Sequence, residues 1–416
     1  MDAVRIYGGK SLSGQTRIQG SKNASLPILA ATLLTDGICE IENCPDIADV
    51  YHMLRLLRSL GCQVDREGSL IRVNTTHLSE CDMPADSVGV MRSSIMLLGA
   101  LLARTGAVSM EYPGGCVIGK RPIDLHLHTL RRMGVEITEK ETGFCAKTMG
   151  LTGAVQELPF VSVGVTENLI LAAVMAKGKT VIHPAAREPE IQALCEFLIC
   201  AGGKIEGVGT DRLVIEGVRQ LHPVRFCVPA DRIVAGTYLA ACLCVGGRIF
   251  LEDAPCAHME SVIACAERLG ARTKQEPCGL LVEGRADKKL EGGLKTAVYP
   301  GFPTDLQSLF MVVMACSGQD GWIEEDVFEN RFRIVPELVK MGACIQVAGT
   351  KAYINGGYPL HNTIVEAKEL RGGAALVVAA LAAEGTGIVK NRHFIDRGYE
   401  DITLSLRELG AAIELA

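Results

Sequence analysis

The stretch LLRSLGCQVD, residues 56–65, carries an apolar helical segment up to a glycine and continues directly into a short strand. Five later stretches repeat this phrase: LRRMGVEIT, FLICAGGKIE, AERLGARTK, LVKMGACIQV and LRELGAAIEL. Glycine readily adopts the left-handed conformation with which many helices end. The marker glycines are spaced 68 to 73 residues apart, so the sequence predicts six repeats, marked by Gly61, Gly134, Gly202, Gly270, Gly342 and Gly410.

A second helix is predicted before each marker, and it is apolar nearly all round, which is typical of a buried helix. Examples are TENLILAAVMA, residues 166–176, and GGAALVVAALAA, residues 372–383. A glycine turn and a strand follow this helix, as in GGRIFLED, and most markers are followed by two strands around a turn. The predicted repeat is therefore strand–helix–strand–helix–strand–strand, which indicates an α/β fold.

The sixth repeat is incomplete, because it ends at Ala416 with a single strand after its marker glycine. The N-terminal stretch AVRIYGG, residues 3–9, is a strand without a repeat of its own. We therefore expect this strand to pair near Ile413 and to complete the last repeat. Three repeats then form each of two domains, residues 22–229 and residues 1–21 with 230–416. We expect a ligand-binding cleft between these domains.

The composition argues against several classes of function. The 416 residues carry a net charge of −6, which predicts no basic surface for nucleic acid. The N-terminus has no apolar signal core, and no apolar run approaches the ~18 residues of a membrane span. We therefore expect a cytoplasmic protein that binds neither nucleic acid nor a membrane. The 16 cysteines include no Cys-x-x-Cys pair, so no metal site is expected.

The stretch YPGGCVIGKRP, residues 112–122, is too rich in glycine and proline for a helix or a packed strand. One interpretation makes Cys116 a small buried apolar residue in a turn. The other makes it a reactive thiol, because Lys120 and Arg121 would lower its pKa and the glycines would let the loop move over a cleft. On chemistry alone, both interpretations stay open.

Two further stretches place polar side chains just before buried helices. GSKNASLP contains Lys22 and Asn23, which are either a surface lysine with a capping asparagine or an anion site at a helix N-terminus. VYPGFPTDLQSLF contains Asp305, which is either a helix N-cap or a general base. For Asp49, Glu188 and Asp231, helix capping or pairing between domains is the favoured interpretation.

Five arginines lie at or near predicted helix starts. A single arginine is usually solvated or paired. Five around one cleft would instead form a site for phosphates and carboxylates, which guanidinium groups bind through two parallel hydrogen bonds. The five are Arg92, Arg121, Arg331, Arg371 and Arg397.

The motifs GSKN, GGCxIGxRPIDLH, SVGxTEN, FPTDLQ, FENRF, LRGGAALV and DRGYE together resemble the family of UDP-N-acetylglucosamine 1-carboxyvinyltransferases. The resemblance covers essentially the whole chain, with the motifs in the family's order and spacing. It implies a two-domain inside-out α/β barrel, the enolpyruvyl transferase fold, with six βαβαββ repeats, three per domain.

The implied reaction transfers enolpyruvate from phosphoenolpyruvate to the 3′-hydroxyl of UDP-N-acetylglucosamine (UDP-GlcNAc). It releases phosphate by addition and elimination through a tetrahedral intermediate, and it is the first committed step of peptidoglycan synthesis. The resemblance further implies a monomer that needs neither a metal nor a cofactor.

The resemblance also implies residue roles. Cys116 is the expected general acid that protonates the methylene carbon of phosphoenolpyruvate, and it is the expected target of fosfomycin. The anionic substrate is expected to be held by Lys22, Arg121 and Arg397, with charge nearby from Arg92 and Arg371. Arg331 is also expected to bind substrate. The amino sugar is expected to contact Asn23, Asp305 and Val327, with Asp305 also the base for the 3′-hydroxyl. Uridine and diphosphate are expected to face Arg121, Pro122, Ile123, Asp124, Leu125, Val161, Ser162, Val163 and Gly164.

Two positions depart from the family pattern. Phe160 stands where some members carry a lysine before VSVG, and Glu369 stands where others carry aspartate. Two alternatives stay open beside the favoured function. An enzyme of the 5-enolpyruvylshikimate-3-phosphate synthase type is disfavoured by Cys116 and Asn23, since that type needs no loop cysteine and typically has serine after its lysine. A non-catalytic nucleotide-sugar-binding paralogue is disfavoured because the catalytic set is complete.

Overall fold

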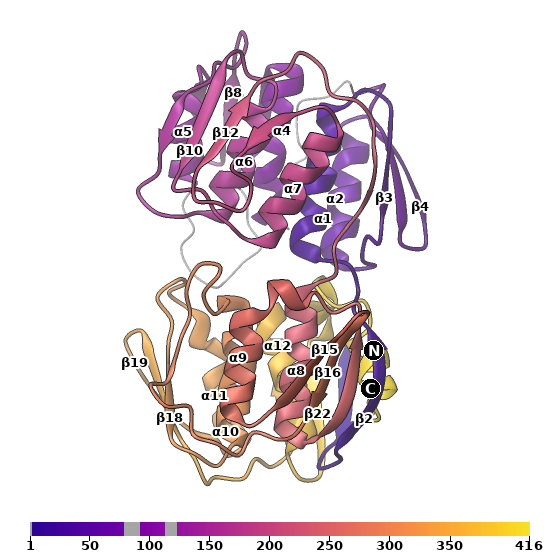
Figure 1. The fold of residues 1–416 in the computed structure, drawn as a ribbon, viewed down its shortest axis with the longest axis vertical. Coiled ribbons are helices and arrows are strands. Elements are labelled where there is room, and N and C mark those ends of the chain that lie inside the picture. Colours follow the sequence, from indigo (N-terminus) through magenta and orange to yellow (C-terminus); the bar gives the residue numbers. More distant parts are fainter. Residues whose placement is uncertain (1, 79–91, 113–122) are drawn as a thin grey trace. The chain divides into compact units, whose positions relative to one another are not determined.

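The computed structural model describes residues 2–78, 92–112 and 123–416 (Figure 1). These residues form two compact units. Unit 1 contains residues 2–19 and 230–416, and unit 2 contains residues 20–78, 92–112 and 123–229. Of the predicted site, Cys116, Arg121 and Pro122 fall outside the described residues.

Each unit is built around three helices that are mostly buried. In α12, for example, every residue but the last is buried. A helix that is apolar all round must be covered on all sides, which is why the sheets lie outside these helices (Figure 1). The buried helices are α1 (Lys22–Ala31), α4 (Met96–Thr105) and α6 (Val163–Ala173) in unit 2, and α8 (Arg232–Val245), α10 (Gln307–Cys316) and α12 (Leu370–Ala382) in unit 1.

The second helix of each repeat ends one to three residues before its marker glycine, close to where the sequence predicts. All six marker glycines have positive φ, between 86° at Gly410 and 122° at Gly270, so each chain reversal uses a conformation that other residues rarely adopt. These helices are α2 (Ala48–Ser59), α5 (Asp124–Arg131), α7 (Pro189–Cys200), α9 (Glu260–Leu269), α11 (Val335–Lys340) and α13 (Ile402–Glu408).

Three sheets surround the helices of unit 2. Their strands, in spatial order, are β13 (Arg225–Cys227), β3 (Ile38–Glu42), β5 (Leu70–Asn74) and β4 (Gln63–Glu67); β6 (Ala107–Glu111), β8 (Gly143–Lys147) and β7 (Glu136–Glu139); and β9 (Val155–Glu157), β10 (Lys179–His183), β12 (Leu213–Glu216) and β11 (Lys204–Glu206). In the two four-stranded sheets one edge strand is parallel to its neighbour and the remaining pairs are antiparallel.

Unit 1 repeats this arrangement three times. Its sheets contain β2 (Leu12–Arg17), β14 (Gly247–Glu252), β16 (Gly279–Glu283) and β15 (Arg272–Glu276); β17 (Leu294–Lys295), β18 (Gly321–Glu324), β20 (Lys351–Asn355) and β19 (Cys344–Ala348); and β21 (Ile364–Glu366), β22 (Thr386–Lys390), β1 (Ala3–Tyr7) and β23 (Ala412–Leu415). Short 3-10 helices join several elements: η1 (Thr32–Leu34), η2 (Arg92–Ile95), η3 (Cys256–His258), η4 (Thr304–Leu306), η5 (Arg331–Ile334) and η6 (Arg392–Arg397).

The N-terminal strand completes the sixth repeat. β1 lies between β22 and β23 and is antiparallel to both, with Ile6 opposite Ile413 and Val4 opposite Val389. Val4 and Ile6 are fully buried, so the strand contributes to the core of unit 1 as well as to its hydrogen bonds. This confirms the pairing that the unpartnered strand in the sequence predicts.

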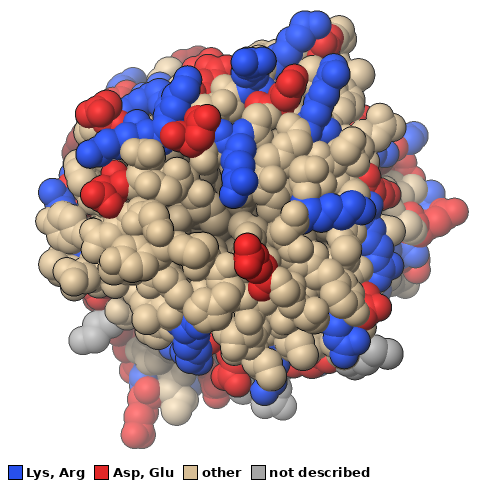
Figure 2. Space-filling view, turned by 90° about the horizontal axis from the view of Figure 1, so that it is seen from below, with Lys and Arg blue, Asp and Glu red and all other residues tan. Residues whose placement is uncertain are grey.

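The surface mixes charges of both signs. On the face shown in Figure 2, Lys and Arg side chains are interspersed with Asp and Glu, and a large part of the face carries no charge. Within the described parts of the chain, no helix combines the length and the apolar character that crossing a membrane requires.

Candidate functional site

In unit 1, Asp305 lies between two buried arginines. It belongs to η4, directly before the buried helix α10. One carboxylate oxygen, Oδ2, lies 3.3 Å from Nη2 of Arg371, and Oδ1 pairs with Nη2 of Arg331. Both arginine side chains are 3% exposed, whereas that of Asp305 is 25% exposed, so the carboxylate is held from inside and open on one side. The alternative that Asp305 caps the helix is wrong, because Leu306 occupies the N-cap position of α10.

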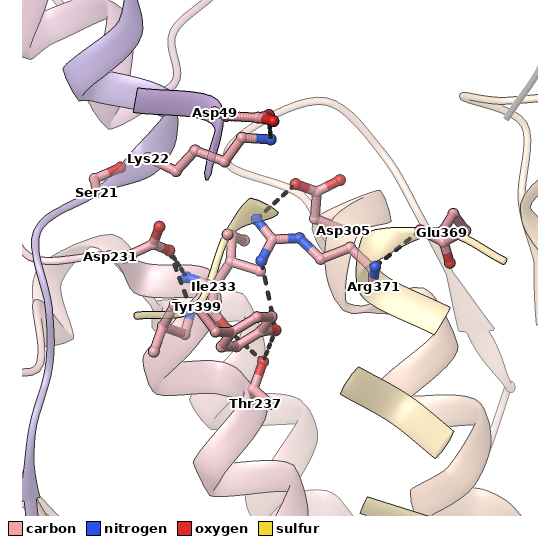
Figure 3. Close-up of polar contacts among 12 residues, drawn as sticks. Ser21, Lys22, Asp49, Asp231, Ile233, Thr237, Asp305, Glu369, Arg371 and Tyr399 are labelled. Atoms are coloured by element: carbon pink, nitrogen blue, oxygen red, sulfur yellow. Dashed lines mark hydrogen bonds and ion pairs between the residues drawn. The ribbon is translucent and has the colours of Figure 1, made fainter. Parts of the chain in front are cut away.

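Arg371 is held by a chain of hydroxyl groups in addition to Asp305 (Figure 3). Thr237 donates its only hydroxyl proton to the carbonyl of Ile233 at 2.8 Å. Tyr399 must therefore donate to Thr237, at 2.7 Å, and accept from Nη1 of Arg371 at 3.4 Å. Burial raises the pKa of Tyr399, which keeps its hydroxyl protonated. Burial alone would lower the pKa of Arg371, but the charge of Asp305 raises it, so this arginine stays charged.

Glu369, one of the two departures from the family pattern, caps the helix that carries Arg371. Its carboxylate accepts hydrogen bonds from the backbone N–H of Arg371, at 2.8 Å, and of Gly372. A negative charge at the N-terminus of a buried helix is favourable, because the first amides have no partner within the helix. Glutamate therefore fills the position as the cap of α12.

Sequence reasoning missed Glu325, which connects Val327 to the turn with Asp305. Glu325 accepts from the backbone N–H of Val327 at 2.8 Å and from the hydroxyl of Thr304 at 2.7 Å. The signal in the sequence is the pair Glu324–Glu325 at the end of a strand. Because side chains alternate along a strand, one of two consecutive acids must face inward.

In unit 2, Lys22 is a largely buried partner of Asp49. It is the first residue of α1, and its Nζ lies 2.9 Å from Oδ2 of Asp49, in the first turn of α2 (Figure 3). The two side chains are 13% and 2% exposed. Ser21, not Asn23, caps the helix by accepting from the N–H of Ala24 at 3.3 Å. The interpretation as a surface lysine beside a capping asparagine is therefore wrong, and Asn23 is the second helical residue.

Two segments expected to face the nucleotide begin neighbouring helices in unit 2. Asp124 begins α5 after Ile123, and Ser162 caps α6 by accepting from the N–H of Val165 at 3.4 Å. A side chain at Gly164 would have its Cβ 3.4 Å from Cε1 of His126, so the two helix starts approach closely. The structure therefore brings the start of α5 close to the start of α6. Phe160, the other departure, is 61% exposed just before this segment.

Four other residues that the sequence analysis named lie at helix ends. Arg397 is the last residue of η6 and is half-buried, and Arg92 is the first residue of η2. Asp231 is the N-cap of α8, with its carboxylate accepting from the N–H of Ile233 at 2.8 Å, which confirms its capping role. Glu188 occupies the N-cap position of α7 without a side-chain hydrogen bond to the helix among the described contacts.

The whole chain resembles proteins of known name. A family model described as EPSP synthase (3-phosphoshikimate 1-carboxyvinyltransferase) matches residues 6–406. UDP-N-acetylglucosamine 1-carboxyvinyltransferase 2 of Caldanaerobacter subterraneus subsp. tengcongensis is 42% identical over 413 residues, 99% of each chain. The UDP-N-acetylglucosamine 1-carboxyvinyltransferase of Shewanella denitrificans is 44% identical over 415 residues, also 99% of each chain.

Solved structures show the same fold. The enolpyruvyl transferase NikO from Streptomyces tendae superposes with a TM-score of 0.89 at 26% identity, covering 99% of this chain and 98% of its own. An EPSP synthase from Acinetobacter baumannii superposes with a TM-score of 0.75 at 18% identity over the whole of both chains, which is a likeness of fold.

Proposed function

This chain belongs to the EPSP synthase family, and we propose that it is the UDP-N-acetylglucosamine 1-carboxyvinyltransferase of that family. The observation that carries the proposal is the full-length identity of 42% and 44% to enzymes of that name. The enolpyruvyl transferase fold of NikO, at a TM-score of 0.89, confirms the fold class that the resemblance implies. The proposed reaction transfers enolpyruvate from phosphoenolpyruvate to the 3′-hydroxyl of UDP-GlcNAc and releases phosphate.

The reaction needs an acid and a base in addition to fixed positive charge. The acceptor hydroxyl loses its proton to Asp305 and attacks C2 of phosphoenolpyruvate, while Cys116 donates a proton to the methylene carbon. The tetrahedral intermediate then loses a proton from that carbon and expels phosphate. Each proton transfer of this kind contributes about 10²- to 10⁴-fold to the rate.

The surroundings of Asp305 support its role as the base. Its carboxylate is one-quarter exposed, and two guanidinium groups fix its position from the buried side. When phosphoenolpyruvate binds, its carboxylate and phosphate compete for the positive charge of Arg371. This competition leaves the Asp305 carboxylate a stronger base, and the same cation stabilises the charged intermediate.

The remaining roles follow the resemblance. Lys22, Arg121 and Arg397 bind phosphoenolpyruvate, with Arg92 nearby. Asn23 and Val327 bind the amino sugar, and the nucleotide lies along the segments Arg121–Leu125 and Val161–Gly164. We assign the two units as the two domains of the enzyme. The protein acts as a monomer in the cytoplasm, without metal or cofactor, at the first committed step of peptidoglycan synthesis.

Phosphate release with two acceptors tests the function. We expect phosphoenolpyruvate with UDP-GlcNAc to release phosphate, and phosphoenolpyruvate with shikimate 3-phosphate to release none above the rate without acceptor. The reason is that Cys116 and Asn23 belong to the nucleotide-sugar pattern. Release with shikimate 3-phosphate alone would reverse the assignment within the family. Binding of UDP-GlcNAc with no phosphate release would identify a non-catalytic paralogue.

Replacement of Lys22 tests the anion site. We expect Lys22→Ala to raise the KM for phosphoenolpyruvate about 10- to 100-fold, because a hydrogen bond to a charged group contributes about 1.5–3 kcal/mol. Steady-state phosphate release, with each substrate varied in turn, measures this. Lys147→Ala is the matched control, since Lys147 is an exposed lysine at the end of β8. Equal KM values in the two variants would remove Lys22 from the site.

A further inference from the structure

Glu325 is a buried carboxylate that joins two separate turns of unit 1. It directly follows β18 and is 3% exposed. Oε1 accepts from the backbone N–H groups of Val327, at 2.8 Å, and Phe328, at 3.0 Å. Oε2 accepts from the hydroxyl of Thr304 at 2.7 Å. One side chain therefore ties the turn 325–328 to η4, which carries Asp305.

These contacts close into a circuit. Asp305 follows Thr304 in the chain and pairs with Arg331. The guanidinium carbon of Arg331 lies 5.3 Å from the centre of the Phe328 ring, and the N–H of Phe328 donates to Glu325. The circuit therefore consists of Glu325, Thr304, Asp305, Arg331 and Phe328, and each of these residues restrains the next. A group held from several sides keeps its position far better than one held by a single contact.

The hydrogen bonds to the following turn do not by themselves require a glutamate at position 325. A short acceptor such as aspartate or serine suffices to accept the N–H groups of a following turn. Glutamate adds the reach to Thr304, 21 residues earlier in the chain. Among the described residues Glu325 takes part in no ion pair, so its buried charge is stabilised by two amides and one hydroxyl. Such burial is tolerated only when the hydrogen bonds are made.

We infer that Glu325 is a positioning residue for the acceptor sugar, an inference that rests on the proposed function. Asp305 and Val327 are the proposed contacts of the amino sugar, and Glu325 sets their separation. Lys22, Arg121 and Arg397, the proposed phosphoenolpyruvate ligands, take no part in the circuit. Loss of Glu325 should therefore weaken the use of UDP-GlcNAc and leave the use of phosphoenolpyruvate nearly unchanged.

Steady-state phosphate release by the full chain, with each substrate varied in turn, tests this. We expect Glu325→Ala to raise the KM for UDP-GlcNAc about tenfold or more and to lower kcat about tenfold, since a displacement of 1 Å can cost about a hundredfold. The KM for phosphoenolpyruvate should change less than about threefold, because the substitution displaces the proposed contacts of the sugar and not those of phosphoenolpyruvate. Glu325→Gln keeps an oxygen that accepts from both amides, and it should restore most of the lost activity.

Glu324→Gln is the matched control. Glu324 is the preceding residue, but its carboxylate pairs with Lys295 at 2.8 Å and Lys351 at 3.2 Å, away from Thr304 and Val327. We expect kinetics like those of the unmodified chain. Thr304→Val removes one contact of the circuit without removing the carboxylate, so it serves if Glu325→Ala does not fold. It should raise the KM for UDP-GlcNAc, and Thr304→Ser should restore it.

The outcomes separate the possibilities. Glu325→Ala, or Thr304→Val in its place, with both KM values unchanged would overturn the inference. So would an equal rise of both KM values, which is expected of general loosening, and so would kinetics indistinguishable from those of Glu324→Gln. Failure of the unmodified chain to release phosphate with UDP-GlcNAc would overturn the proposed function itself, and the inference with it.

Discussion

We expect Asp305→Ala to lower kcat for phosphate release by about 10²- to 10⁴-fold, the usual contribution of a general base. The variant should also be less stable, by about 3–5 kcal/mol, because removal of one partner of a buried ion pair leaves charge uncompensated. Arg331 and Arg371 are each 3% exposed and both lose their carboxylate. Urea unfolding measures the loss of stability, and initial rates measure the loss of activity.

Asp305→Asn separates the two effects. Asparagine keeps the shape of the side chain, but its single oxygen accepts a hydrogen bond from only one of the two guanidinium groups, and it cannot take a proton at neutral pH. We expect part of the stability to return and the activity to stay lost. Glu216→Ala is the control for simple loss of an ion pair, because Glu216 pairs with Lys204 on the surface, where such pairs contribute about 0–1 kcal/mol. Full activity in Asp305→Asn would exclude the base role.

We expect Cys116→Ala and Cys116→Ser to lower turnover by about 10²- to 10⁴-fold, since the proposed general acid is lost. Cys116→Asp should retain activity, because a carboxylic acid can also donate a proton, and it should resist fosfomycin. Fosfomycin should label Cys116 selectively, and faster when UDP-GlcNAc is bound. Peptide mass spectrometry locates the adduct, and steady-state phosphate release measures the turnover.

The other cysteines provide the internal control for labelling. Burial raises the pKa of Cys195, Cys242 and Cys265 to about 12, so their thiols form little thiolate at neutral pH. Cys200, Cys227 and Cys278 are exposed and accessible to any reagent. An adduct on one of these three, or normal turnover by Cys116→Ala, would show that the loop was assigned wrongly.

Much of the fold follows from local sequence signals. The six marker glycines are visible because a left-handed residue at a helix end is a local requirement, and all six have positive φ in the structure. The buried helices can be recognised in the sequence because their apolar residues cover every face. The N-terminal strand could be assigned to the last sheet, because it belongs to no repeat of its own and the sixth repeat lacks one strand.

The contacts of the candidate site could not be predicted from the sequence. The sequence marks Lys22 and Asp305 as candidates, but their partners lie far along the chain: Asp49 for Lys22, and Arg331 and Arg371 for Asp305. No local pattern distinguishes a helix cap from an ion pair with such partners. Glu325 was missed for the same reason, since its hydroxyl partner Thr304 lies 21 residues away.

The sequence by itself therefore determined the repeat, the order of its elements, the role of the N-terminal strand and the residues that resemble a known family. Helix periodicity, glycine conformations and motif spacing act within a few residues, so they can be read along the chain. Only the tertiary structure decided which charged groups meet. Arg371 reaches Asp305 across 66 residues, because packing of α10 against α12, and not sequence distance, makes the two neighbours.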